Sequence, residues 1–140
     1  MKAKALAAAF IAATLTACTG SVNYREASGY FFKNNQPCPK DILVITNKAE
    51  LERHFGYAAT MSQRPTEVDF SKEAVLAIVL PETDLSTDIG IKGITSKQGS
   101  LTVNYKVNTG AKNSYTIQPM RMIVVDKSTL QNKTVTAKDN

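Results

Sequence analysis

The residues with the most specific chemistry in this chain are 15–18, Leu-Thr-Ala-Cys, at the end of a short apolar segment. Lys2 and Lys4 precede 13 uncharged, mostly apolar residues at positions 5–17. A basic start, an apolar middle and small residues at the end are typical of a secretory signal. The segment is also shorter than the roughly 20 apolar residues of a spanning helix. We therefore predict that residues 1–17 are a signal peptide.

The position of Cys18 favours one class of signal. An ordinary signal peptidase needs small residues at the first and third positions before the cut, and Leu15 at the third position is bulky. The lipoprotein pattern asks instead for an aliphatic residue there and a cysteine immediately after the cut. We predict cleavage before Cys18 and attachment of lipid to its thiol. The alternative is an unlipidated Cys18 behind an ordinary signal.

A lipid on Cys18 would place the protein in the bacterial cell envelope, with the membrane as its first partner. Each buried CH₂ group contributes about 0.8 kcal/mol, and two or more chains anchor a protein stably. Bacterial lipoproteins carry more than one chain. Thr19 follows the cysteine where inner-membrane retention would use Asp. By similarity to enterobacterial sorting rules, this favours the outer membrane.

The rest of the sequence contains little catalytic chemistry. His54 is the only histidine, and it has no second histidine or Cys-x-x-Cys to complete a metal site or triad. Neither Gly-x-Ser-x-Gly nor a phosphate-binding loop is present. Acidic residues cluster at 67–69 and 82–88 but lack the alternating pattern of a calcium loop. We predict that the protein is not an enzyme and has neither a cofactor nor a metal site.

Charge and cysteine content further restrict the partners and the disulfide chemistry that this protein can have. After cleavage, residues 18–140 carry 15 basic and 12 acidic residues, a net charge of +3. The charges are mixed along the chain without a basic run, so we expect no nucleic-acid partner. Cys38 is then the only thiol besides Cys18, so no internal disulfide is expected. Between Pro37 and Pro39, Cys38 fits a half-buried small residue better than a reactive thiol.

We predict one small domain at 29–140, preceded by a polar tether at 18–28. A single short helix is predicted near 48–55, with Asn47 as N-cap. Apolar runs predict strands, and the run at 74–80 is expected to be buried on both faces. Further strands are expected at 41–46, 88–95, 101–107, 115–117 and 120–125. The apolar run at 29–32 is either a first strand or a segment that covers the core. The fold class is α+β, mainly antiparallel β, either a sandwich or an open barrel.

Turns and ends are predicted from Gly, Asn and polar residues. Gly56 is expected to end the helix, and Gly90 and Gly93 indicate a bulge. Turns are expected at 98–100 and 108–111, and a polar loop at 82–87. From residue 126 onward the chain is polar and is expected to fray.

The polar loop is the best candidate for partner binding, because loops held by a rigid scaffold often carry function. It leaves a buried strand, and Leu85 is an apolar residue in a polar setting. An ordinary connection between strands is the alternative. The predicted contact residues are Thr83, Asp84, Leu85, Ser86 and Thr87, with Met61 and Arg64 from the other long loop.

Residues 68–78, V-D-F-S-K-E-A-V-L-A-I, resemble the opening of a small β domain, the C-terminal domain family of the protease complex subunit PrcB. The resemblance covers about 68–127. In that family the loop after the buried strand has a Thr-Gly-Gly-Tyr-like core, similar to the inhibitory loop of chagasin-type cysteine protease inhibitors. This chain has D-L-S-T-D at 84–88 instead.

The resemblance implies a subunit or inhibitor of a secreted or surface protease, acting by backbone insertion into a cleft. Two functions therefore stay open. The first is a protein-binding module, possible forms of which are a protease-associated subunit and a protease inhibitor. The second is a structural or ligand-holding envelope lipoprotein without a protease link.

Overall fold

The structure is a computed structural model that describes residues 20–58 and 63–140. Its one α-helix in these ranges is α2 (Lys48–His54), and a 3₁₀ turn, η1 (Lys127–Leu130), follows the ninth strand. The strands are β1 (Gly20–Ser21), β2 (Arg25–Ala27), β3 (Tyr30–Phe32), β4 (Leu43–Ile45), β5 (Phe55–Tyr57), β6 (Glu73–Val79), β7 (Thr83–Lys97), β8 (Ser100–Ile117), β9 (Met120–Asp126) and β10 (Thr134–Asp139). The predicted class, mainly β with one short helix, is confirmed. Within the described ranges, no helix has the length and apolar character needed to cross a membrane.

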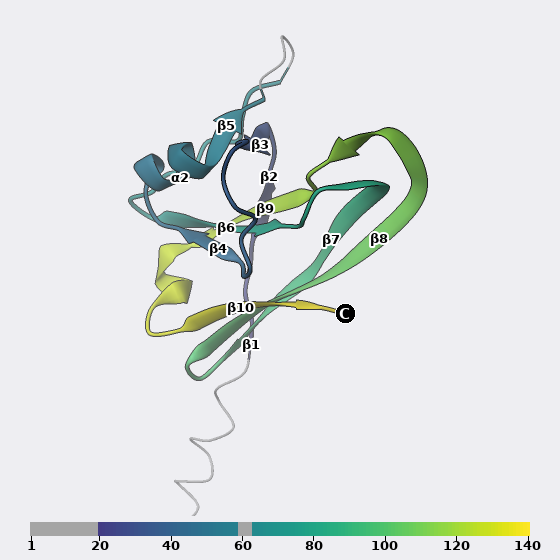
Figure 1. Ribbon diagram of the computed structural model, residues 1–140. Helices are drawn as coiled ribbons and strands as arrows, with labels where there is room; N and C mark the ends of the chain where they lie inside the picture. Colours follow the sequence, from purple (N-terminus) through teal and green to yellow (C-terminus); the bar gives the residue numbers. More distant parts are fainter. Residues whose placement is uncertain (1–19, 59–62) are drawn as a thin grey trace, which may run out of the picture.

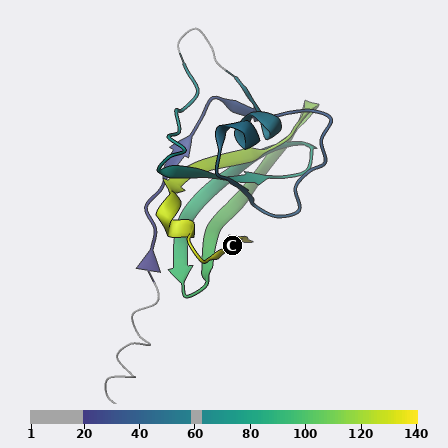
Figure 2. The same cartoon turned by 90° about the vertical axis from the view of Figure 1, so that its left-hand side faces the viewer.

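The strands form two four-stranded sheets and one two-stranded sheet. Sheet A has the order β1-β7-β8-β10, sheet B has the order β2-β9-β6-β4, and sheet C pairs β3 with β5. All pairs are antiparallel except β8 with β10, which is parallel. Sheets A and B face each other as a sandwich and do not close into a barrel (Figures 1 and 2).

Sheet B is the middle layer and is buried on both faces. Alternate residues of β6 and β9 face sheet A, and they are Leu76, Ile78, Ile123 and Val125. The residues between them face the layer formed by α2, β3 and β5, and they are Val75, Ala77, Val79, Met122 and Val124. This double burial explains the unbroken apolar run at 74–80 and confirms its prediction.

Sheet A has one packed face and one open face. Ile94, Leu101 and Val103 point into the interior between the sheets. Polar residues alternate with them on the outer face, where Asn104 Nδ2 donates to Thr95 Oγ1 at 3.1 Å. The predicted alternation in β8 is therefore confirmed for its first half.

Helix α2 begins as predicted and ends slightly earlier. The Asn47 side chain accepts a hydrogen bond from the Glu50 N–H at 2.8 Å. Phe55 already belongs to β5, because residues 55–57 pair with β3. Gly56, expected as the helix stop, therefore lies in a strand. A Cβ at this position would clash with the Phe31 ring, so Gly56 makes room for that ring.

Both ends of the domain are more ordered than the sequence indicates. The tether prediction was wrong for residues 20–27, because β1 pairs with β7 and β2 pairs with β9. The predicted fraying after residue 126 was also wrong, because β10 pairs with β8 and packs Val135 and Ala137 against the interior. These are edge strands in which few residues are buried, so their sequences look polar.

Strands β7 and β8 form one long twisted ribbon, joined by the predicted turn at Gln98 and Gly99 (φ 77°). The register shifts between Ile91 and Gly93, which confirms a bulge at Gly93. The predicted turn at 108–111 was wrong, because β8 continues through these residues. Asn and Gly at these positions instead accompany further register shifts toward the far end of the ribbon.

Candidate functional site

The predicted contact residues at 83–87 begin strand β7 and do not form a loop. The ribbon register shifts on both sides of Leu85. The Thr83 hydroxyl accepts a hydrogen bond from the Leu85 N–H at 3.1 Å, and the Thr87 hydroxyl donates to the Leu85 carbonyl at 2.9 Å. The loop prediction was wrong because these threonines satisfy the Leu85 backbone inside an irregular strand.

The far half of the ribbon, residues 83–88 with 108–117, is here called the distal ribbon. In the part of the chain that the structure describes, β1 and β10 pair with the ribbon only near its turn, so the distal ribbon is two-stranded. It curves away from sheet B (Figure 1). Asp84 and Lys112 form an ion pair across it at 3.4 Å. Leu85 is 38% exposed and Tyr115 is 62% exposed.

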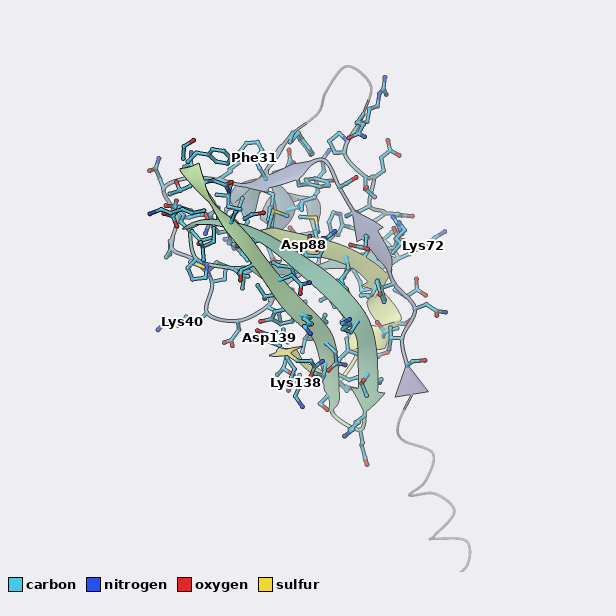
Figure 3. All side chains as sticks on the ribbon, turned by 90° about the vertical axis from the view of Figure 1, so that its right-hand side faces the viewer. Phe31, Lys40, Lys72, Asp88, Lys138 and Asp139 are labelled. Carbon is cyan, nitrogen blue, oxygen red and sulfur yellow. The ribbon has the colours of Figure 1, made fainter. Side chains whose placement is uncertain are left out.

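A groove of about 430 Å³, here called the distal groove, lies between β3 and the base of the distal ribbon. Phe31 borders it, is 48% exposed, and lies near the end of β8 in Figure 3. Glu82, directly before the predicted contact residues, is the charged residue in its lining. The lining residues are Tyr30, Phe31, Phe32, Asn34, Glu82, Thr116, Ile117, Gln118 and Met120.

Arg64 lies in a different hollow, of about 590 Å³, here called the tyrosine hollow. It is lined by Tyr30, Lys48, Leu51, Tyr57, Arg64, Pro65, Thr66, Glu67, Val68 and Phe70. Tyr30 borders both hollows, so β3 separates them. Arg64 therefore lies on the other side of β3 from the distal groove, and Met61 lies outside the described residues.

The Tyr30 side chain is hydrogen-bonded to Thr66, in the segment that lines one side of the tyrosine hollow. Its hydroxyl donates to the Thr66 carbonyl at 2.5 Å, and the Thr66 N–H donates to the Ser28 carbonyl at 2.9 Å. Burial, with a smaller contribution from Tyr57 and Glu67, raises the pKa of Tyr30. The neutral phenol that donates this bond is therefore favoured in the fold, and its contribution to stability is lost only as pH rises through that raised pKa.

Gly29, which packs against Pro65 beside these hydrogen bonds, is expected not to tolerate a side chain. Its φ is +87°, and a Cβ would meet the Pro65 Cα at 2.6 Å. We expect Gly29→Ala to lower the free energy of unfolding by about 2 kcal/mol or more. Chemical denaturation measures this change, with Gly20→Ala as the control, because a Cβ at Gly20 meets nothing within 4 Å. Equal stability of the two variants would contradict the expected clash.

The V-D-F-S-K-E motif forms a turn that enters β6. Asp69 accepts hydrogen bonds from the Ser71 hydroxyl at 2.6 Å and the Ser71 N–H at 3.1 Å, which lower the pKa of its carboxyl group. Glu73 forms an ion pair with Arg25, which lowers the Glu73 pKa. The sequence did not reveal this pair, because Arg25 was assigned to the tether. The motif thus has a structural role here.

The remaining reactive groups are isolated from one another. His54 Nδ1 lies 3.0 Å from Gln36 Oε1, and the ring is half-buried beside the end of α2. Cys38 is half-buried, with its sulfur 3.7 Å from the Val79 carbonyl oxygen. Among the described residues, no three His, Cys, Asp or Glu side chains come together in a way that would hold a metal ion.

Comparison with known proteins adds no family. No family model matches the chain, and neither a curated protein nor a solved structure matches it significantly. Function is therefore inferred from the residues and their arrangement.

Proposed function

We propose that the protein is a membrane-anchored, protein-binding module of the bacterial cell envelope. Lipidated Cys18 is the anchor, and the distal ribbon with the distal groove is the contact surface. The observation that carries this proposal is the set of exposed apolar side chains at one end of the molecule, Phe31, Leu85 and Tyr115. Exposed aromatic and aliphatic side chains beside a groove are typical of protein-binding surfaces.

The position of the anchor supports this arrangement. Strand β1 begins at Gly20, two residues after Cys18, and pairs with β7 beside the turn of the long ribbon. Leu85 lies on the same strand as Ser96, the partner of Gly20, and 11 residues away from it. At about 3.3 Å per residue the two are separated by up to roughly 35 Å. The contact surface therefore lies toward the opposite end of the ribbon from β1 (Figure 1).

A protease is the partner class that the resemblance over residues 68–127 implies. The strand geometry changes how such a contact would form. The Leu85 backbone is already bonded to Thr83 and Thr87, so Leu85 would contact a protease through its side chain. Inhibition of the protease or assembly with it would each use this surface, and no catalytic side chain is required of this chain.

A ligand-holding envelope lipoprotein is the second candidate function. The observation that favours it is the tyrosine hollow, whose lining combines Leu51, Val68 and Phe70 with two tyrosines. A hollow of about 590 Å³ falls in the size range of small-molecule sites. Mass spectrometry of the protein purified from its own envelope separates the two functions, because a co-purifying small molecule supports the second.

Recovery of a partner from an envelope extract tests the first function. We expect Phe31→Ala together with Leu85→Ala to reduce partner recovery at least tenfold, because central apolar contacts typically contribute 1–2 kcal/mol or more each. Quantitative mass spectrometry of the captured proteins measures this, and activity assays on any recovered protease identify its class. Replacing Leu85 and Ser86 together tests the ribbon alone.

The matched control is Val44→Ala, on edge strand β4 and 36% exposed. It removes exposed apolar surface from another part of the domain and is expected to leave recovery unchanged. Equal recovery with the wild type and the Phe31/Leu85 double variant would place the contact surface elsewhere. The absence of any protease among the captured proteins would exclude the protease-associated form.

A further inference from the structure

Between the β7–β8 turn and residue 90, the outer face of sheet A carries lysines and no carboxylate. The sequence from 89 to 125 contains no Asp or Glu. Hydrogen bonds between outward side chains define this face, since Asn104 donates to Thr95 at 3.1 Å and the Thr102 and Thr136 hydroxyls lie 3.4 Å apart. The exposed lysines of β7, β8 and β10 in this part of the sheet are Lys92, Lys97, Lys106 and Lys138; Lys112 lies farther along β8, in the distal ribbon.

The carboxylates on β7, β8 and β10 are Asp84, Asp88 and Asp139, and none of them forms an ion pair with these four lysines. Asp88 is bonded to Arg121 at 2.8 Å, and Asp84 is paired with Lys112 at 3.4 Å. Asp139 follows Lys138 and pairs with Tyr105, whose pKa is raised by burial and by this carboxylate. Asp139 is thus in register with the inward Tyr105 and is exposed, whereas Lys138 is in register with Asn104 on the outer face.

Basic and acidic residues are unevenly distributed along the sequence of the domain. Residues 89–138 contain eight basic residues and one acidic residue, Asp126. Residues 41–88, which provide α2, β4, β5, β6 and the start of β7, contain nine acidic and four basic residues. The segment with the basic excess provides most of β7, β8 and β10 of sheet A, together with β9 of sheet B. A surface of one sign is attracted to a surface of the opposite sign.

We propose that the outer face of sheet A lies on the anionic phospholipid headgroups of the membrane. The place of the anchor selects this occupant, because β1 is the edge strand of the same sheet and begins two residues after Cys18. In this respect the proposal depends on the proposed lipidation. Figure 3 looks onto this face, with β7 and β8 in front. Threonine and asparagine side chains between the lysines supply additional donors for headgroup phosphates.

This orientation agrees with the proposed contact surface. Strand β3, which borders the distal groove, belongs to the layer on the far side of sheet B from sheet A. With sheet A on the membrane, the β3 wall of the distal groove lies on the side of the domain away from the membrane, and the opposite wall comes from the end of β8.

Vesicle binding by the unlipidated chain tests the proposal. Residues 19–140 retain every described residue, and both buried clusters lie within this range. The probes are vesicles of phosphatidylcholine with 30% phosphatidylglycerol and vesicles of phosphatidylcholine alone. We expect binding to the anionic vesicles only, weakening as salt rises. Because each lysine near an anionic surface contributes roughly fivefold, replacing all four with Gln should weaken binding about a hundredfold or more.

The matched control replaces Lys33, Lys40, Lys48 and Lys72 with Gln, which removes the same charge from exposed positions outside this face. It is expected to weaken binding much less. An equal loss in both variants, or no binding of the wild type to anionic vesicles, would overturn the proposal. Tighter binding to a polyanion such as single-stranded DNA than to the vesicles would assign the face to another partner and would also overturn it.

All eight lysines are exposed, so their replacement is expected to leave the fold intact. Thermal unfolding of each variant checks this. The failure of this proposal is distinguishable from failure of the proposed function. The vesicle assay uses a chain without Cys18, so it is independent of lipidation and of any protein partner. Partner recovery with the Phe31 and Leu85 variants tests the contact surface in turn.

Discussion

Replacement of Cys18 with serine is expected to move the protein from the membrane fraction to the soluble fraction. Serine keeps the size of the side chain but removes the thiol that would carry the lipid. Two or more acyl chains, at about 0.8 kcal/mol per buried CH₂, hold a protein far more tightly than any surface contact of this small domain. We expect the ratio of membrane-bound to soluble protein to fall more than ~100-fold. Fractionation of cells followed by quantitative immunoblotting measures this ratio.

Cys38→Ser is the matched control, because it changes the other cysteine and leaves the signal intact. It should leave the protein in the membrane fraction. Washing at high salt separates the anchor from the basic face of sheet A. Lipidated protein resists the wash and is released by detergent, whereas protein held only by its lysines is released by salt. A Cys18→Ser protein that still resists the salt wash would contradict the lipid anchor.

The parts of the fold that could be predicted are those that produce a recognisable local pattern in the sequence. The run at 74–80 is apolar at every position because sheet B is covered on both faces. The helix start was predictable because Asn47 bonds the N–H of Glu50, three residues away. In each case the determining contacts are either local or repeated along one strand.

The parts that could not be predicted depend on partners far away in the chain. Strands β1, β2 and β10 lie at sheet edges, so only some of their residues are buried. Their backbone groups bond to strands that are distant in sequence, and no local pattern reports this. The same applies at 108–111, where Asn and Gly predict a turn but the pairing with β7 continues with shifted register.

The candidate site was predictable in part. Leu85 was singled out as an exposed apolar residue, and it is exposed. Phe31 was missed as a contact residue because the whole run at 29–32 looked like strand or cover for the core. Strand alternation provides the signal that could have found it, since Tyr30 and Phe32 share one face and Phe31 lies on the other. The groove itself depends on the meeting of β3 with the end of β8, which is a tertiary contact.

The buried leucine of β6 is expected to show the largest effect on stability. Leu76 is fully buried between sheets A and B, where it packs with Ile123 and Leu101. We expect Leu76→Ala to lower the free energy of unfolding by about 3–5 kcal/mol, because it removes apolar contacts and leaves a cavity in a close-packed interior. In a domain of this size that is a large share of the usual 5–15 kcal/mol. Urea denaturation monitored by circular dichroism measures the change.

Leu85→Ala is the control for this experiment, because it makes the same substitution at a leucine that is 38% exposed. It is expected to cost less than about 1 kcal/mol, since most of its side chain meets water or the edge of the ribbon. The pair separates two roles of leucine in this chain. Loss of stability at Leu76 with partner recovery lost only at Leu85 would fit a core residue and a contact residue. Similar destabilisation by both would mean that the distal ribbon is packed more tightly than its exposure indicates, and that a binding defect at Leu85 reflects unfolding.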